Sequence, residues 1–165
     1  LAGARHVIAV DPTTLKRDTA MSLGATHAVA TAEEALELSK QLTRGVGATS
    51  AIITVGNVTT NVVDAAFEVI SKSGTVVITA LAPFKDKTIT LSGTEAVLWR
   101  KTVRGSLFGD CNPTTDIPRL LDLYRDGQLK LDELLTRTYT LDQINEGYEH
   151  LLSGELIRGV IVHQH

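Results

Sequence analysis

The sequence predicts an α/β fold built on a doubly wound parallel sheet. Short β-branched runs alternate with stretches of helical periodicity along the first half of the chain. No tight hairpin signal lies between these runs, so right-handed βαβ crossovers between parallel strands are expected. A length of 165 residues suits one domain with a sizeable core.

Each predicted element of the first half has its own local signal. The first helix follows a strand directly, is capped by Thr13 or Thr14, and ends at Gly24. The next helix opens with a capping box that begins at Thr31, because Thr and Glu side chains can satisfy free backbone donors there. Strands are predicted at 6–11, 25–30, 50–55 and 75–81, and a further helix at about 60–71.

The pattern changes after Pro83. Two strands are expected at 88–91 and 102–108, separated by a mixed segment that contains Trp99. One helix carries Pro118 in its first turn, and a second opens with a capping box at residues 140–143. A last strand is predicted at 159–163.

Composition excludes several classes of function. The net charge of −3 provides no global positive field for nucleic acid, and no apolar run approaches the roughly 20 residues of a membrane span. Cys111 is the only cysteine, and no signal peptide opens the chain. We therefore expect a cytoplasmic protein that binds neither nucleic acid nor a membrane.

Asp11 carries the main functional signal. An acidic residue at the end of the second strand of a doubly wound sheet accepts hydrogen bonds from an adenosine ribose and repels a 2′-phosphate, which favours NAD over NADP. The glycine fingerprint should lie about 20 residues earlier, but only ten residues precede Asp11. The fold therefore lacks its first strand and glycine loop. An alternative interpretation is that Asp11 caps the helix that follows Pro12.

Other candidate residues carry weaker signals. Gly56 and the turn at residues 80–82 follow predicted strands, where open α/β sheets bind ligands, but ordinary turn and packing roles explain them equally. Arg158 could pair with a pyrophosphate or lie on the surface in water. The five histidines show no metal-ligand spacing.

Taken together, these segments resemble the zinc-type medium-chain alcohol dehydrogenases, from within the Rossmann-type coenzyme domain to the C-terminus. The sequence of these segments is most similar to actinobacterial nicotinoprotein alcohol dehydrogenases assayed with nitrosodimethylaniline (NDMA). The class III-like, glutathione-dependent formaldehyde dehydrogenases are relatives. The segments that carry the resemblance are AGARHVIAVD, LKRDTAMSLGATHAV, TVVITALAP, VRGSLFGD, IPRLLDLYRDGQLKLDELLTRTYTLDQINEGYEHLLSGE and IRGVIV.

The resemblance implies a cofactor-binding role for nine positions. Asp11 would bind the adenosine ribose with Lys16, and Arg158 would bind the pyrophosphate. The remaining positions would line the adenosine side (Val55 and Gly56) and the nicotinamide side (Ala80, Ala82 and the backbone of Ser106 and Phe108).

The resemblance also implies how the chain divides into domains. Residues 1–110 would be a partial NAD-binding domain, including a dimer strand at 88–91, and residues 111–165 would complete its junction with the catalytic domain. The zinc ligands and glycine fingerprint of the family belong upstream of Leu1, so no catalytic or metal-binding residue is assigned to this chain. Alone it should be inactive and should aggregate or pair with itself.

The expected function is the C-terminal portion of an NAD-dependent zinc alcohol dehydrogenase. Hydride would pass between a primary alcohol or aldehyde and nicotinamide in a homodimer or homotetramer. Two alternatives stay open: a zinc-free medium-chain quinone or enoyl reductase, and a dinucleotide-binding module without catalytic activity. Asp11 argues against the first, and the long C-terminal match argues against the second.

Overall fold

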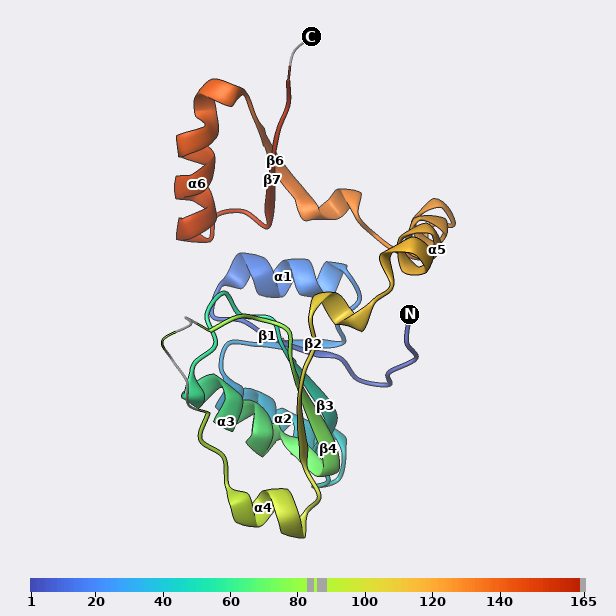
Figure 1. Cartoon of the computed structure of the whole chain (residues 1–165), viewed down its shortest axis with the longest axis vertical. Helices are drawn as coiled ribbons and strands as arrows, with labels where there is room; N and C mark the ends of the chain where they lie inside the picture. The colour runs from blue at the N-terminus through green and yellow to red at the C-terminus, as the bar shows by residue number, and fades with distance from the viewer. Residues whose placement is uncertain (83–84, 86–88, 164–165) are drawn as a thin grey trace. The chain divides into compact units, whose positions relative to one another are not determined.

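The computed structural model describes residues 1–82, 85 and 89–163, which form two compact units. One unit combines residues 1–30 with 112–165, and the other comprises residues 31–111. Every strand pair is parallel, and helices alternate with strands along the chain (Figure 1). The α/β fold with parallel strands is therefore confirmed. The expected domain division at 110/111 stays a prediction. The two compact units are defined by contacts within this chain and do not test a division between a coenzyme domain and a catalytic domain.

The N-terminal part of the first unit is a strand, helix and strand. β1 (Ile8–Val10) pairs with β2 (His27–Val29), and α1 (Thr14–Ser22) connects them. Thr13 occupies the N-cap position of α1, but its side chain makes no capping hydrogen bond. Gly24 follows the helix at φ +107°, a conformation that glycine adopts without steric cost.

The C-terminal part of the first unit adds a second pair of strands. Its elements are α5 (Pro113–Arg125), η2 (Asp132–Leu134), β6 (Leu135–Tyr139), η3 (Leu141–Gln143), α6 (Ile144–Ser153) and β7 (Arg158–Ile161). The capping box between Thr140 and Gln143 is confirmed. Pro118 lies inside α5 instead of in its first turn, because the helix begins earlier, at Pro113. The sequence did not predict β6.

The second unit contains a three-stranded sheet in the order β3-β4-β5. Its elements are α2 (Ala32–Leu42), β3 (Ala48–Ile53), α3 (Thr60–Val69), β4 (Ile70–Ile78), α4 (Gly93–Leu98), β5 (Thr102–Gly105) and η1 (Phe108–Asp110). α3 packs against β3 and β4, and α2 packs against α3 (Figure 1). The core between them consists of Ile53, Val58, Val63, Phe67, Ile70 and Val76.

The start of α2 shows how local sequence sets an element. The Thr31 hydroxyl accepts a hydrogen bond from the Glu34 backbone N–H, as the capping box predicts. At Glu33, a hydrogen bond from its own backbone N–H and another from Thr31 hold the pKa of the carboxyl below its ordinary value. The carboxylate therefore stays charged at the helix N-terminus, where the helix dipole favours a negative charge.

Three segments of the second unit differ from expectation. β4 begins directly after α3, so that Gly74 lies inside the strand instead of before it. α4 was not predicted, and β5 ends at Gly105, earlier than 108. Of the expected dimer strand, Thr88 lies outside the described residues, and 89–91 pair with no strand in the described part of the chain. That strand was expected to pair with a second copy, so it stays a prediction.

The described strands form three separate sheets, β1-β2 and β6-β7 in the first unit and β3-β4-β5 in the second. β1 and β3 are each at the edge of their own sheet. None of the helices in the described part of the chain is long and apolar enough to cross a membrane.

Candidate functional site

Asp11 directly follows β1, at the carboxyl end of the first parallel pair. Its backbone N–H donates to the Val29 carbonyl, which extends the pairing of β1 and β2 by one residue. Its Oδ1 accepts a hydrogen bond of 2.8 Å from the Thr13 backbone N–H. This bond goes to the N-cap residue Thr13, so Asp11 holds the turn before α1 and is not itself the helix cap. Oδ2 has no hydrogen-bond partner among the described residues and is available to a ligand.

Two basic residues follow Asp11 on α1, and they differ in exposure and in hydrogen bonding. Lys16 is exposed, and its side chain makes no polar contact within the described residues. Arg17 was not predicted: its guanidinium donates to the carbonyl oxygens of Asp11 (2.7 Å) and Pro12 (2.8 Å). A third bond runs from Arg17 to the Thr14 hydroxyl at 3.0 Å. Arg17 therefore fixes the turn that carries the Asp11 carboxylate.

Arg158, the first residue of β7, lies in the same unit. It is exposed, pairs across the sheet with Leu135, and lines a cavity of about 350 Å³ between α6 and the β6–β7 pair. The other lining residues are mostly apolar and include Tyr139, Tyr148, Leu151 and Leu156. Arg158 has no carboxylate partner among the described residues, so its charge is open to an anionic ligand.

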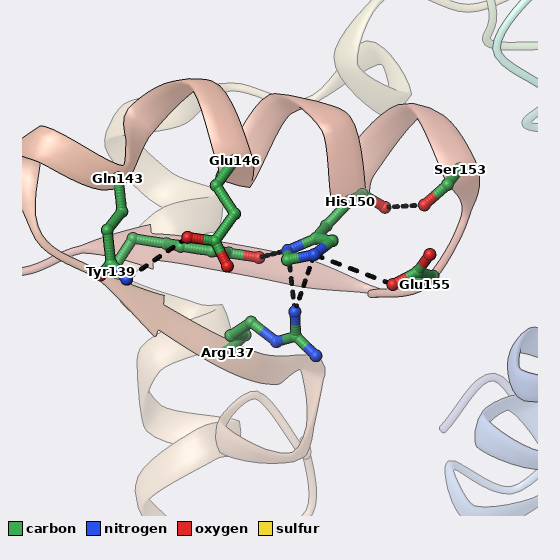
Figure 2. A network of polar contacts seen from close by, with 7 residues as sticks. All are labelled: Arg137, Tyr139, Gln143, Glu146, His150, Ser153 and Glu155. Carbon is green, nitrogen blue, oxygen red and sulfur yellow. Dashed lines mark hydrogen bonds and ion pairs between the residues drawn. The ribbon is translucent and has the colours of Figure 1, made fainter.

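A polar cluster around His150 joins α6 to β6 beside this cavity (Figure 2). The Tyr139 hydroxyl lies 2.9 Å from His150 Nδ1, and Arg137 Nη1 lies 2.8 Å from the same atom. Because a guanidinium only donates, a ring nitrogen of His150 accepts from it. Glu155 stands 3.9 Å from Nε2 on another side of the ring. This cluster holds α6 against the β6–β7 pair. Arg158 is the first residue of β7.

In the second unit, the predicted residues gather at the carboxyl ends of its three strands. Ile53, Ile78 and Gly105 lie side by side in the register of the sheet. The chain then leaves each strand: Val55 and Gly56 after β3, Ala80 and Ala82 after β4, and Ser106 and Phe108 after β5. Parallel sheets bind ligands at this edge. Ala80 packs partly against the core, whereas Gly56 and Ala82 are exposed.

The backbone after β5 offers two complementary polar groups. The Ser106 N–H donates to the Ile78 carbonyl at 2.9 Å. The carbonyl oxygen of Ser106 itself receives no hydrogen bond from the described residues and can act as an acceptor. The Phe108 N–H has no acceptor among the described residues, and the Phe108 side chain is 85% exposed. One free acceptor and one free donor are what a primary carboxamide requires.

The turn that carries Phe108 has an unusual backbone. Phe108, Gly109 and Asp110 have φ values of 49°, 72° and 54°, so that three consecutive residues are left-handed. L-residues normally visit this region singly, at a cost of roughly 1–2 kcal/mol each. The ion pair that closes the turn, Arg104 Nη2 to Asp110 Oδ2 at 2.6 Å, is exposed, and such pairs contribute about 0–1 kcal/mol. Strain of this kind is characteristic of ligand-binding segments.

The predicted site residues divide between the two compact units. Asp11, Lys16 and Arg158 belong to the first, and Val55, Gly56, Ala80, Ala82, Ser106 and Phe108 belong to the second. Most of them lie at a strand end or within a few residues after one, whereas Lys16 lies in α1 and Phe108 in η1. Among residues 1–82, 85 and 89–163, no group of three or more His, Cys, Asp or Glu side chains could hold a metal ion.

Comparison with known proteins gives consistent matches along the chain. The family model described as zinc-binding dehydrogenase matches residues 1–126. The NDMA-dependent alcohol dehydrogenase of Amycolatopsis methanolica is 55% identical over 98% of this chain and 44% of its own length. Alcohol dehydrogenase B of Mycobacterium tuberculosis is 43% identical over 97% of this chain and 43% of its own length. The chain spans less than half the length of these relatives.

Solved structures show the same likeness in the fold. An alcohol dehydrogenase zinc-binding domain protein from Burkholderia ambifaria superposes with a TM-score of 0.89, at 29% identity, over 99% of this chain and 43% of its own. Benzyl alcohol dehydrogenase from Acinetobacter calcoaceticus gives 0.86, at 26% identity, over 96% and 43%. On the match over residues 1–126, the chain belongs to the zinc-binding dehydrogenase family.

Proposed function

We propose that this chain contributes the adenosine, pyrophosphate and carboxamide contacts of an NAD-dependent alcohol dehydrogenase. The observation that carries the proposal is the Asp11 carboxylate, which stands at a strand end with Oδ2 unoccupied by any described residue. Membership of the zinc-binding dehydrogenase family and likeness to two proteins named alcohol dehydrogenases support it.

The residues of the first unit would bind the adenosine half of the cofactor. Asp11 Oδ2 would accept a hydrogen bond from a ribose hydroxyl, and Lys16 would donate to the same sugar. Arg158 would pair its planar guanidinium with the pyrophosphate. A 2′-phosphate would place its negative charge against Asp11, so NAD is favoured over NADP.

The residues of the second unit would contact both the adenosine and the nicotinamide of the cofactor. Val55 and Gly56 would pass beside the adenosine, and Ala80 and Ala82 would lie beside the nicotinamide, where small side chains allow close approach. The carboxamide would accept from the Phe108 N–H and donate to the Ser106 carbonyl.

When bound, the nicotinamide would exchange hydride with a primary alcohol or aldehyde. The described residues contain no group of three or more His, Cys, Asp or Glu side chains that could hold zinc, which would be bound by other residues of the full-length protein. No catalytic residue is assigned to this chain. The assembly proposed for the protein is a homodimer or homotetramer in the cytoplasm.

The test of this proposal is a comparison of NAD⁺ and NADP⁺ binding by the full-length protein that carries the chain. Asn at position 11 keeps the acceptor for Thr13 but loses the charge. We therefore expect Asp11→Asn to weaken NAD⁺ binding roughly 10- to 100-fold, because a charge-assisted hydrogen bond is lost. The difference in affinity between NAD⁺ and NADP⁺ should become smaller. Asp18→Asn, on the exposed surface of α1, is the matched control and should change neither affinity.

The alternatives give different results in the same sample. A preference for NADP⁺, together with no zinc by elemental analysis, would replace this proposal with the zinc-free reductase. Nucleotide binding that changes assembly without any turnover of alcohols would indicate a binding module instead. Zinc together with retained NAD would support the alcohol dehydrogenase.

A further inference from the structure

The left-handed turn at 108–110 is held by very little of the chain itself. Gly109 has open space around the position of a Cβ, and Leu107 and Phe108 are 67% and 85% exposed. The Asp110 N–H donates to the Leu107 carbonyl at 2.9 Å, which closes the turn locally. Apart from that bond, the contact that ties the turn to a strand is the pair between Arg104 and Asp110.

The position of Arg104 gives this pair a specific geometric role. Arg104 lies in β5, opposite Val77 of β4, so its backbone is fixed by the sheet. Asp110 is the last left-handed residue of the turn. The ion pair therefore bridges the rigid strand to the far end of the turn, with Phe108 between the two anchors.

We propose that Arg104 and Asp110 are a positioning pair, which keeps the 108–110 turn left-handed so that the Phe108 N–H faces the nicotinamide carboxamide. This inference rests on the proposed function. Neither side chain touches the cofactor; both act through the backbone of Phe108. Without the pair, the strained turn relaxes toward ordinary backbone conformations, and the donor no longer points at the carboxamide.

The experiment compares NAD⁺ with ADP-ribose, which has the same adenosine and pyrophosphate but no nicotinamide. Affinities are measured by calorimetry on the full-length protein after removal of any bound nucleotide. Arg104→Gln should weaken NAD⁺ binding roughly three- to tenfold, as expected for one hydrogen bond, and leave ADP-ribose binding unchanged. Asp110→Asn should do the same, because asparagine tolerates the left-handed conformation but lacks the charge.

Two further variants sharpen the result. The double variant of Arg104→Gln and Asp110→Asn should lose no more affinity than either single variant, because both remove the same pair. Arg125→Gln breaks another exposed Arg–Asp pair, with Asp122 at 3.4 Å on α5, and should change neither affinity. If Arg104→Gln fails to fold, Asp110→Asn makes the same test.

The possible outcomes distinguish a failure of this inference from a failure of the proposed function on which it rests. Equal losses for NAD⁺ and ADP-ribose would make the pair a general structural feature and overturn the inference, as would no loss at all. Failure of the unaltered protein to bind either nucleotide would overturn the proposed function, and the inference with it.

Discussion

Lys101 shows at the residue scale how a charged side chain is accommodated inside the second unit. Its side chain is 3% exposed, and its ammonium donates to the Phe67 carbonyl (2.7 Å) and to Glu95 Oε2 (3.0 Å). The same nitrogen lies 4.7 Å from the centre of the Phe67 ring and 5.0 Å from that of Trp99. Phe67 is in the last turn of α3, so the cation also meets the negative end of the helix dipole.

Replacing Lys101 by methionine tests this arrangement. The change leaves the Phe67 carbonyl without its donor and Glu95 without its partner, so we expect a loss of about 1–3 kcal/mol in the free energy of unfolding. Urea titration of the full-length protein measures it. Lys72→Met, on an exposed lysine of β4, is the control and should stay within about 0.5 kcal/mol. Equal stability of the two variants would contradict the role given to Lys101.

At the scale of elements, Tyr139 holds α6 against the β6–β7 pair. The Tyr139 ring is buried between two glycines, Gly147 on α6 and Gly159 on β7, and its hydroxyl meets His150. A Cβ at position 159 would lie 2.8 Å from Tyr139 Cε2, whereas a Cβ at position 147 would lie 3.4 Å from the ring. The strand glycine is therefore required by the ring, and the helix glycine much less so.

Alanine at these two glycines should have opposite effects on stability. Gly159→Ala forces the Tyr139 ring to move, which we expect to cost about 1–3 kcal/mol. Gly147→Ala makes a close contact but gains helix propensity of up to about 1 kcal/mol, so it should be neutral or stabilising. Thermal unfolding midpoints compare the pair directly. A Gly159→Ala variant as stable as the unaltered protein would show that the ring has room to shift.

At the scale of the whole molecule, the exposed edges and apolar side chains govern behaviour in solution. β1 and β3 are edge strands of their sheets, and Ile52 of β3 is 66% exposed. In the first unit, Tyr139 and Leu156 are the buried hydrophobic residues among those described, whereas Leu151 and Leu152 are exposed. An open strand edge beside apolar surface is a template for pairing with another chain.

The 165-residue chain expressed alone should therefore associate with itself or unfold without cooperativity. Light scattering after size exclusion measures the association, and a melt followed by circular dichroism measures the cooperativity. Addition of charge at the β3 edge, by Ile52→Lys, should reduce the association; Thr49→Lys, at another exposed position of β3, tests whether a charge elsewhere on the same strand acts equally. A cooperative transition from a monomeric species would contradict this expectation.

Local sequence patterns account for the parts of this protein that depend on neighbouring residues in the chain. The alternation of strands and helices, the N-cap at Thr31 and the capping box at Thr140 follow from residues close together in the chain, and the alternation in turn indicated parallel strands. Asp11 at a strand end also came from such a local pattern. α4 and β6 carry similar local signals, Ser92 with Glu95 at the start of α4, and Thr136, Thr138 and Tyr139 in β6.

The tertiary structure alone decided which side chains meet across the chain. Lys101 reaches a carbonyl 34 residues away, and the Tyr139 hydroxyl reaches His150 eleven residues on, through elements whose packing no local pattern specifies. The left-handed turn at 108–110 likewise depends on Arg104, which the sheet holds in place. Periodicity and capping act over a few residues, whereas these contacts depend on the paths of separate elements in space, and for that reason only the folded structure reveals them.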